Sequence, residues 1–218
     1  MGGFAVILLS VAGKFITFEG GEGVGKSTQV ARVAEALRAT GLTVVMTREP
    51  GGTPGAEAIR TLLMTGSDEK WNAQTETLLF AAARADHVAK VIQQALMRGD
   101  WVLCDRFIDS TRAYQGAGGG ITDDDIMALH HVGSGGLMPD RTILLDLPTQ
   151  QGNARAGKRS DGIHDRMGAK NDSYYQAVRD RFLMLAGEEP HRFAVIDADL
   201  PAASVTDLIV TRLRDLLP

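Results

Sequence analysis

Short apolar runs alternate along the chain with longer segments of helical periodicity. The apolar runs cover residues 14–20, 42–49, 101–106, 141–148 and 193–198. Each has the length of a strand and is almost continuously apolar, which indicates strands that are buried on both faces. Helical spacing of apolar positions is found over residues 26–40, 53–64, 74–97, 122–132, 172–186 and 202–217. The alternation predicts an α/β fold, with a five-stranded parallel sheet flanked by helices on both faces.

The domain organisation follows from the segments between these elements. No internal repeat and no linker rich in Pro, Gly or Ser divides the chain, so residues 14–218 are predicted to form a single domain, with residues 116–120 and 152–170 as loops. Residues 1–13 contain an apolar patch far shorter than the roughly 20 residues of a membrane helix, and we interpret them as an N-terminal extension. Ligands of open parallel sheets bind beyond the carboxyl ends of the strands, where the chemistry is therefore expected.

Composition narrows the range of partners. The formal net charge is −4, with 44% hydrophobic and 23% charged residues, which argues against broad affinity for a nucleic acid polymer or for an anionic membrane surface. Cys104 is the single cysteine, so an intramolecular disulfide and a cysteine-rich metal site are excluded, and a reducing, cytoplasmic location is predicted. Because Cys104 lies within an apolar run, it is interpreted as a buried structural thiol.

A glycine-rich segment joins the first predicted strand to the first predicted helix. Gly20, Gly25, Lys26 and Ser27 satisfy the pattern G-x-x-x-x-G-K-[ST] in the context that makes it specific. Glycines allow backbone N–H groups to point inward, and the following helix adds its positive end, so phosphate oxygens are the expected ligand. Lys26 can neutralise the β and γ phosphates, while the Ser27 hydroxyl can bind Mg²⁺. The predicted ATP-binding residues are Gly20, Gly21, Glu22, Gly23, Val24, Gly25, Lys26, Ser27 and Thr28.

Other classes of nucleotide-binding protein would carry additional motifs. A GTPase would carry D-x-x-G after a strand and N-K-x-D for the base; residues 165–168 read DRMG but fall in a polar loop, and no N-K-x-D occurs. The residues by themselves leave open a kinase for a nucleoside monophosphate or a deoxynucleoside, and a nucleotide-gated switch that acts by binding a partner.

Three further motifs favour a phosphoryl acceptor, although each alone has a structural alternative. TREPGG places Arg48 at a strand end, where it can bind a phosphate or remain a solvated loop residue. In LLFAAARADH, Phe80 and Arg84 share a helix face, so the ring could stack on a nucleobase while the guanidinium hydrogen-bonds it. Alternatively, Phe80 is a core residue and Arg84 extends to solvent. CDRFIDSTRAYQG places Asp105 and Arg106 at the end of the third strand. Asp105 could hold the magnesium shell or orient the attacking phosphate, and Arg106 could bind the acceptor's phosphate. The alternative is that both belong to a packing network.

Taken in order, these motifs resemble those of one enzyme family. EGGEGVGKST, TREPGGT, LLFAAAR, DRFIDSTRAYQG and the late VIDA are similar to the successive motifs of the bacterial thymidylate kinases, from about residue 14 to the C-terminus. The resemblance implies the P-loop kinase fold with a mobile lid, and transfer of a phosphoryl group from ATP to dTMP with Mg²⁺ in dTTP biosynthesis. It also implies a homodimer.

The resemblance assigns roles in acceptor binding. Glu22 would approach the 3′-hydroxyl of the sugar, and Arg48 and Arg106 would hold the phosphate. Phe80 would stack on thymine, and Arg84 would hydrogen-bond a base carbonyl. The remaining acceptor contacts would be Ser110, Thr111, Tyr114 and Gln115, of which Tyr114 would crowd the 2′ position and so favour deoxyribose.

The segment 151–170 is similar to the lid of these kinases. Positions 21–24 of the glycine loop contain no basic residue, so the lid is expected to supply the charge that stabilises the transferring phosphoryl group; the alternative is a solvated basic loop. The lid's basic residues are Arg155, Lys158, Arg159, Arg166 and Lys170. The catalytic set is predicted to be Lys26, Asp105, Arg155 and Arg159, with Ser27 and Asp105 at the metal.

Overall fold

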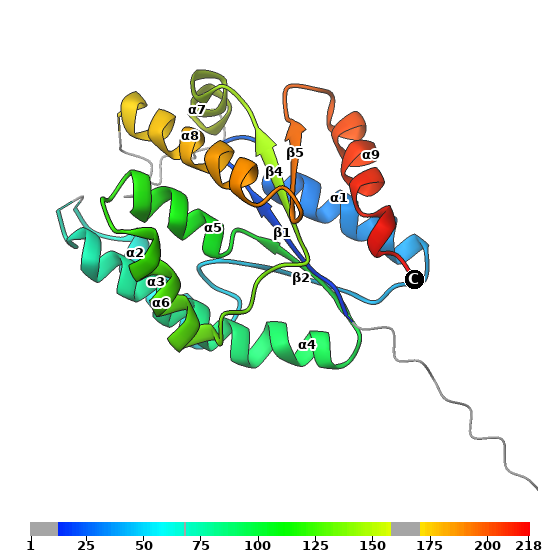
Figure 1. Ribbon diagram of the computed structural model, residues 1–218, viewed down its shortest axis with the longest axis horizontal. Coiled ribbons are helices and arrows are strands. Elements are labelled where there is room, and N and C mark those ends of the chain that lie inside the picture. Colours follow the sequence, from blue (N-terminus) through cyan, green and yellow to red (C-terminus); the bar gives the residue numbers. More distant parts are fainter. Residues whose placement is uncertain (1–12, 68, 158–170) are drawn as a thin grey trace, which may run out of the picture.

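A single parallel sheet forms the centre of the molecule (Figure 1). The structure is a computed structural model that describes residues 13–67, 69–157 and 171–218. Its five strands lie in the order β2-β3-β1-β4-β5 and are all parallel, which confirms the prediction. The strands are β1 (Phe15–Glu19), β2 (Val44–Arg48), β3 (Trp101–Asp105), β4 (Arg141–Asp146) and β5 (Phe193–Asp197).

Burial differs between the central and the edge strands. Every residue of β1 is buried, and β3 and β4 are buried except at their ends. In contrast, β2 and β5 alternate between buried and more exposed positions, so the prediction of burial on both faces is wrong for these two strands. They lie at the edges of the sheet, where the helical layers cover less of their surface. Met46 and Val195 are exposed there as a result.

Helices cover both faces of the sheet, as Figure 1 shows. Ile16 and Phe18 of β1 pack in one core cluster with α1 (Lys26–Ala39) and α9 (Ala202–Arg212). Phe15, which points the opposite way because side chains alternate along a strand, packs in a second cluster beside Cys104. The free thiol of Cys104 is buried there, as predicted. The other long helices are α2 (Pro54–Met64), α3 (Ala73–His87), α6 (Asp123–Ser134) and α8 (Asp172–Glu188).

Short helical segments account for most differences from the predicted elements. Residues 74–97 are helical as expected, but the π-helical turn η1 (Val88–Ile92) separates α3 from α4 (Gln93–Met97). After β3 the chain forms α5 (Ile108–Thr111) and the π-helical η2 (Arg112–Ala117), which takes in the first part of the predicted loop 116–120. The C-terminal prediction 202–217 is divided into α9 and the 3-10 helix η4 (Arg214–Leu216).

The predicted loop 152–170 is wrong over its first part, because α7 extends over Thr149–Gly157. The sequence of this helix contains two glycines and little apolar periodicity, so tertiary contact decides its conformation. A Cβ atom on Gly152 would lie 2.6 Å from the carbonyl oxygen of Glu22, and one on Gly23 would lie 2.1 Å from the carbonyl oxygen of Gly152. The two glycines therefore allow α7 to pack directly on the glycine loop. Residues 158–170 lie outside the described residues.

A buried polar cluster anchors α5 and η2 to the sheet. The carboxylate of Asp109 accepts hydrogen bonds from Arg192 at 2.6 and 2.8 Å, from Thr142 at 3.1 Å and from Arg112 at 3.2 Å. Arg112 also binds Asp123 and Glu189. Such a cluster is tolerated in the core only because its polar atoms are paired, and it holds in place the segment that carries the predicted acceptor residues.

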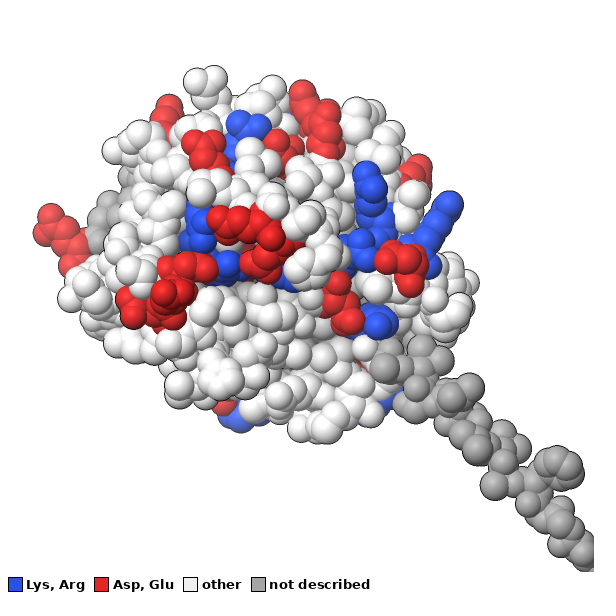
Figure 2. Space-filling view, viewed as in Figure 1, with Lys and Arg blue, Asp and Glu red and all other residues white. Residues whose placement is uncertain are grey.

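The surface carries charges of both signs. On the face shown in Figure 2, acidic and basic side chains are interspersed. Within the described ranges, no helix is both long enough and apolar enough to cross a lipid bilayer.

Candidate active site

The glycine loop lies between β1 and α1, at the carboxyl edge of the sheet. Gly20, Gly23 and Gly25 have φ angles of 130°, 68° and 97°, which favour glycine. A Cβ atom on Gly20 would also lie 2.4 Å from the carbonyl oxygen of Leu145. Gly25 is the residue before the first turn of α1, so the loop leads directly to the positive end of that helix.

Lys26 and Ser27 follow the glycine loop directly and contribute an ammonium group and a hydroxyl group. The ammonium of Lys26 is buried and donates to the carbonyl oxygens of Gly20 at 3.1 Å and Gly21 at 2.6 Å. The Ser27 hydroxyl donates to the carboxylate of Asp105 at 2.6 Å. Asp105 ends β3, next to β1 in the sheet, so the structure brings together the two residues that the sequence assigned to the metal.

The electrostatic environment of the loop changes two pKa values. Burial and the neighbouring cation Arg106 together lower the pKa of Lys26 to about 8, against the opposing effect of Glu22 and Asp105. Arg106 also lowers the pKa of Glu22 to about 2. A bound polyphosphate would favour the charged form of Lys26, because an opposite charge nearby stabilises it.

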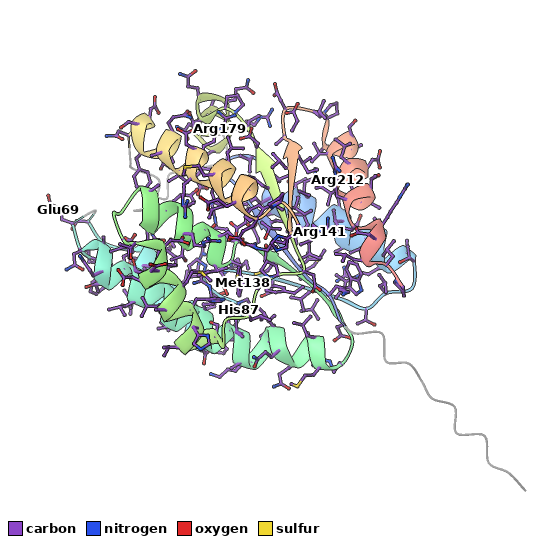
Figure 3. The ribbon with its side chains drawn as sticks, in the orientation of Figure 1. Glu69, His87, Met138, Arg141, Arg179 and Arg212 are labelled. Carbon is purple, nitrogen blue, oxygen red and sulfur yellow. The ribbon has the colours of Figure 1, made fainter. Side chains whose placement is uncertain are left out.

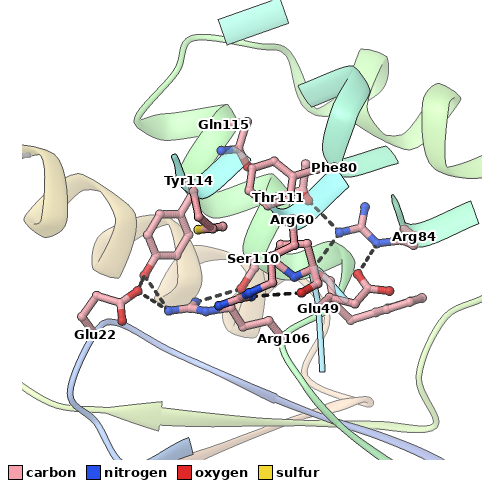
Figure 4. Close-up of a pocket in the computed structure, with 13 residues that line it drawn as sticks. Glu22, Glu49, Arg60, Phe80, Arg84, Arg106, Ser110, Thr111, Tyr114 and Gln115 are labelled. Carbon is pink, nitrogen blue, oxygen red and sulfur yellow. Dashed lines mark hydrogen bonds and ion pairs between the residues drawn. The ribbon is translucent and has the colours of Figure 1, made fainter. Parts of the chain in front are cut away.

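A cavity opens beside the glycine loop, between α2, α3 and the segment that follows β3 (Figure 4). Its volume is about 150 Å³. The residues around it come from distant parts of the chain and combine apolar surface with three arginines and two carboxylates. The lining consists of Glu22, Glu49, Pro50, Arg60, Met64, Phe80, Arg84, Arg106, Phe107, Ser110, Thr111, Tyr114 and Gln115.

Arg106 occupies the end of the cavity nearest the glycine loop. Its guanidinium donates to the Gly20 carbonyl at 3.1 Å, the Ser110 hydroxyl at 3.0 Å and the Glu22 carboxylate at 2.5 Å. The ring of Tyr114 stacks beneath it at 4.9 Å, and the Tyr114 hydroxyl accepts from it at 3.2 Å. Arg106 has a φ angle of 70°, the only positive value at a described residue other than glycine, and such outliers concentrate at functional sites.

Arg84 lies at the other end of the cavity, in a fully enclosed ion pair with Glu49 (Figure 4). Its Nε donates to Glu49 at 2.8 Å, and its Nη2 donates to Thr111 at 2.8 Å and to the Phe107 carbonyl at 3.3 Å. The side chains of Arg84 and Glu49 are only 3% and 4% exposed. Phe80 lies one helical turn before Arg84 and lines the same cavity, so the structure confirms that these two residues share a face.

Glu19 is buried at the end of β1, beneath Arg106. Its carboxyl group accepts from the Phe107 backbone N–H at 2.8 Å and from the Ser110 hydroxyl at 2.6 Å. Burial and the nearby Asp109 together raise the pKa of Glu19 to about 8, against the opposing effect of the hydrogen bonds from Ser110 and Phe107. Glu19 therefore connects β1 to the segment that carries Arg106 and Ser110, in a form that is largely protonated at neutral pH.

This pKa leads to an expected pH dependence of stability. Between pH 4.5, the ordinary value, and about 8, the folded state binds more protons at Glu19 than the unfolded state does. The contribution to stability is therefore complete below pH 4.5 and is lost as the pH rises toward 8. Glu19→Gln mimics the protonated carboxyl group, so the free energy of unfolding of the wild type should fall relative to this variant by a few kcal/mol across the window. Urea unfolding at several pH values measures it; parallel curves for the two proteins would contradict the assignment.

Several predicted residues lie away from this assembly. Arg48 ends β2 with its side chain 54% exposed, pairs with Glu57 at 3.0 Å and does not line the cavity. Arg155 lies on α7 and pairs with Asp199 at 2.9 Å, so it contacts the segment after β5. The candidate Arg159 and the basic residues Lys158, Arg166 and Lys170 lie outside the described residues, as does most of the predicted lid.

Sequence reasoning missed three charged residues around the site. Glu19 and Glu49 have no role in the expected set, although a carboxylate at the end of an apolar strand is a signal that could have identified each of them. Arg60 lines the cavity from α2 and donates to the Pro50 carbonyl at 2.9 Å. No motif in the sequence marks Arg60, because only the packing of α2 beside α3 brings it there.

Comparisons with known proteins agree on one family. A model of the family described as thymidylate kinase matches residues 18–209. The chain is 51% identical over 206 residues to a thymidylate kinase of Rhizorhabdus wittichii, which covers 94% of this chain and 99% of that protein. It is 49% identical over 205 residues to one of Caulobacter vibrioides, covering 92% and 98%. The crystal structure of thymidylate kinase from Ehrlichia chaffeensis has a TM-score of 0.76 at 34% identity, over 93% of this chain and all of that one.

Proposed function

Because this chain belongs to the thymidylate kinase family, we propose a division of its site into a donor loop and an acceptor cavity that share Arg106. The protein transfers the γ-phosphoryl group of ATP to dTMP, giving dTDP and ADP in dTTP biosynthesis. The triphosphate of ATP binds over residues 20–28, and dTMP binds in the adjoining cavity. The observation that carries this division is the hydrogen bond from Arg106 to the Gly20 carbonyl, because it joins the cavity to the glycine loop.

Arg106 and Arg84 orient the acceptor. The Arg106–Glu22 pair is more accessible than Arg84–Glu49, with side chains 17% and 42% exposed, so Arg106 is the arginine that receives the acceptor phosphate. Glu22 then lies near the sugar, where it contacts the 3′-hydroxyl. At the other end, Arg84 donates from Nη1 to a carbonyl group of thymine while Phe80 stacks on the ring. Arg60, Ser110, Thr111 and Gln115 complete the polar wall of the cavity.

Catalysis in this site requires no nucleophilic side chain. A phosphate oxygen of dTMP attacks the γ-phosphorus, and the protein contributes position and charge. Lys26 stabilises negative charge on the donor phosphates, and Arg106 orients the attacking group. Arg48 and the lid arginines Arg155 and Arg159 are assigned, from the family resemblance, to the acceptor phosphate and to the transferring group. Arg155 would have to leave its ion pair with Asp199 to act there.

The residues at the donor loop also fit a magnesium ion. Within the described residues there is no group of three or more His, Cys, Asp or Glu that could hold a metal. Mg²⁺ is usually bound by one or two protein oxygens together with substrate phosphates, and the Ser27 hydroxyl and Asp105 carboxylate supply such oxygens. When bound, the ion would neutralise charge on the donor phosphates.

A panel of acceptors tests this assignment. ADP release is measured with ATP and, in turn, dTMP, dUMP, dCMP, dGMP and thymidine as acceptor. We expect dTMP to give the largest kcat/KM. Preference for another monophosphate or for thymidine would redefine the acceptor, and slow ATP turnover that ignores the acceptor would indicate a nucleotide-gated switch.

Tyr114 is expected to set the preference for deoxyribose. Its ring is buried between Arg106, Tyr174 and Phe182, and its hydroxyl contacts both Arg106 and Glu22. Tyr114→Ala should relax discrimination between dTMP and the ribose analogue by about tenfold, since the loss of a crowding contact is worth roughly 1–3 kcal/mol. Tyr114→Phe keeps the ring and should retain the preference. Equal discrimination by the alanine variant and the wild type would remove Tyr114 from this role.

A homodimer and a cytoplasmic location complete the proposal. α3 and α6 lie side by side and border a groove that exposes Leu78 and Val132, with 53% and 86% of their surfaces accessible. We assign this groove to a second copy of the chain. Light scattering should give twice the 23.3 kDa mass of one chain, and Leu78→Glu should shift the protein to monomer. A monomeric wild type would refute this part of the proposal.

A further inference from the structure

His87 is completely buried, although it neither lines the acceptor cavity nor contacts the glycine loop. It is the last residue of α3, directly before η1, and is labelled in Figure 3. Its Nδ1 lies 3.0 Å from Oε1 of Glu49, and its Nε2 lies 2.7 Å from the hydroxyl of Thr47. A buried imidazole with both nitrogens engaged by neighbouring side chains is held in one orientation.

The backbone geometry explains why these groups meet. Thr47 belongs to β2 and Glu49 is the first residue after this strand, and both side chains reach the same imidazole. Arg84 and His87 are three residues apart on α3 and therefore share a helix face. His87 bridges Thr47 and Glu49, while Arg84 binds the other oxygen of Glu49. The imidazole thus fixes the carboxylate that fixes the guanidinium.

We propose that His87 is a positioning residue for recognition of the acceptor base, acting through Glu49 on the guanidinium of Arg84. The inference rests on the proposed contact between Arg84 and thymine. Thr111 and the Phe107 carbonyl hold the Nη2 side of the Arg84 guanidinium, and Glu49 holds its Nε side. His87 binds the second oxygen of Glu49 and so keeps that carboxylate in place. The guanidinium is then held at both sides, which leaves Nη1 directed toward a base in the cavity.

Fixing this plane determines which base is accepted. Thymine carries a carbonyl group at position 4, whereas cytosine carries an amino group there. A rigid N–H donor at that point hydrogen-bonds thymine and opposes the amino group of cytosine, and a site of this kind discriminates strongly because a mismatched partner leaves buried polar groups unpaired. A guanidinium that can rotate would lose this selectivity although it keeps its positive charge.

The test measures kcat and KM for dTMP and for dCMP at saturating ATP in a set of variants. His87→Leu removes both polar contacts, and His87→Gln retains a polar group toward Thr47 but not the donor toward Glu49. We expect both to raise KM for dTMP and to lower the dTMP-to-dCMP ratio of kcat/KM by about tenfold, with kcat for dTMP changed less than twofold. His87→Asn keeps an N–H near the position of Nδ1 and is expected to restore most of the ratio.

The reference variant is Arg84→Met, which should lower the same ratio; the double variant Arg84→Met/His87→Leu should lower it no further. A His87→Leu or His87→Gln protein that loses kcat equally for both acceptors, with the ratio unchanged, would show a purely structural histidine and overturn the inference alone. An unchanged ratio in Arg84→Met would refute the proposed base contact itself, and the inference with it.

Discussion

Replacement of Lys26 by alanine is expected to lower kcat by on the order of 10³-fold, because it removes a preorganised cation from the donor phosphates. The lysine is buried, and the Gly20 and Gly21 carbonyls direct its ammonium group into the glycine loop. A water molecule that filled the space left by the side chain would bring no positive charge. The fold should survive, since the same burial that lowers the pKa of Lys26 makes the charge costly to keep in the protein. Steady-state ADP release gives kcat, and thermal unfolding by circular dichroism reports on the fold.

Lys90→Ala is the matched control for this experiment. It makes the same change in net charge on η1, where Lys90 is 61% exposed and pairs with Asp86. Its kcat should stay within twofold of the wild type. Near-normal turnover of Lys26→Ala, in a protein with unchanged unfolding, would mean that the loop lysine serves a role other than phosphate binding.

Replacement of Arg106 by methionine should lower kcat/KM for dTMP by on the order of 10³-fold. Hydrogen bonds to charged groups contribute about 1.5–3 kcal/mol each, and the loss of two from the acceptor phosphate accounts for an effect of this size. Methionine keeps much of the length of the side chain and so preserves packing over Tyr114. The KM for ATP should change far less than the KM for dTMP, which separates the acceptor role from a general loss of the site.

Arg48→Met provides the comparison for Arg106. The sequence assigned both arginines to the acceptor phosphate, but the structure places only Arg106 in the cavity, while Arg48 is exposed beside Glu57. We therefore expect a clearly smaller loss for Arg48→Met. Equal losses in the two variants would indicate that Arg48 leaves Glu57 and joins the acceptor phosphate during the reaction.

Local patterns were sufficient to predict the glycine loop and the five strands. The spacing from Gly20 to Ser27 depends only on consecutive residues and their backbone angles, and the structure has the loop between a strand and a helix as expected. Likewise, Phe80 and Arg84 share a helix face because four residues make about one turn. The fold follows from these local features, and the reaction from the resemblance of the ordered motifs to one family; the comparisons confirm both.

The interactions that hold the site together depend on contacts between distant segments. Glu49 and Arg84 are 35 positions apart, and Glu19 lies 91 positions from Ser110, so no periodicity within either segment connects them. The helix α7 depends on a glycine-to-glycine approach across the loop rather than on its own sequence. One cavity contains a buried ion pair, Arg84–Glu49, and a more accessible one, Arg106–Glu22. This difference in exposure is visible only in the tertiary structure.

The sequence by itself determined that residues 20–28 include a glycine loop at the edge of a parallel sheet, because glycine conformations and hydrophobic periodicity are short-range properties of the chain. Only the tertiary structure decided which charged residue faces which. Ion pairing and burial depend on distances between side chains that the fold brings together, and those distances place Arg106 and Arg84 in the cavity, Arg48 on the surface and His87 behind Glu49.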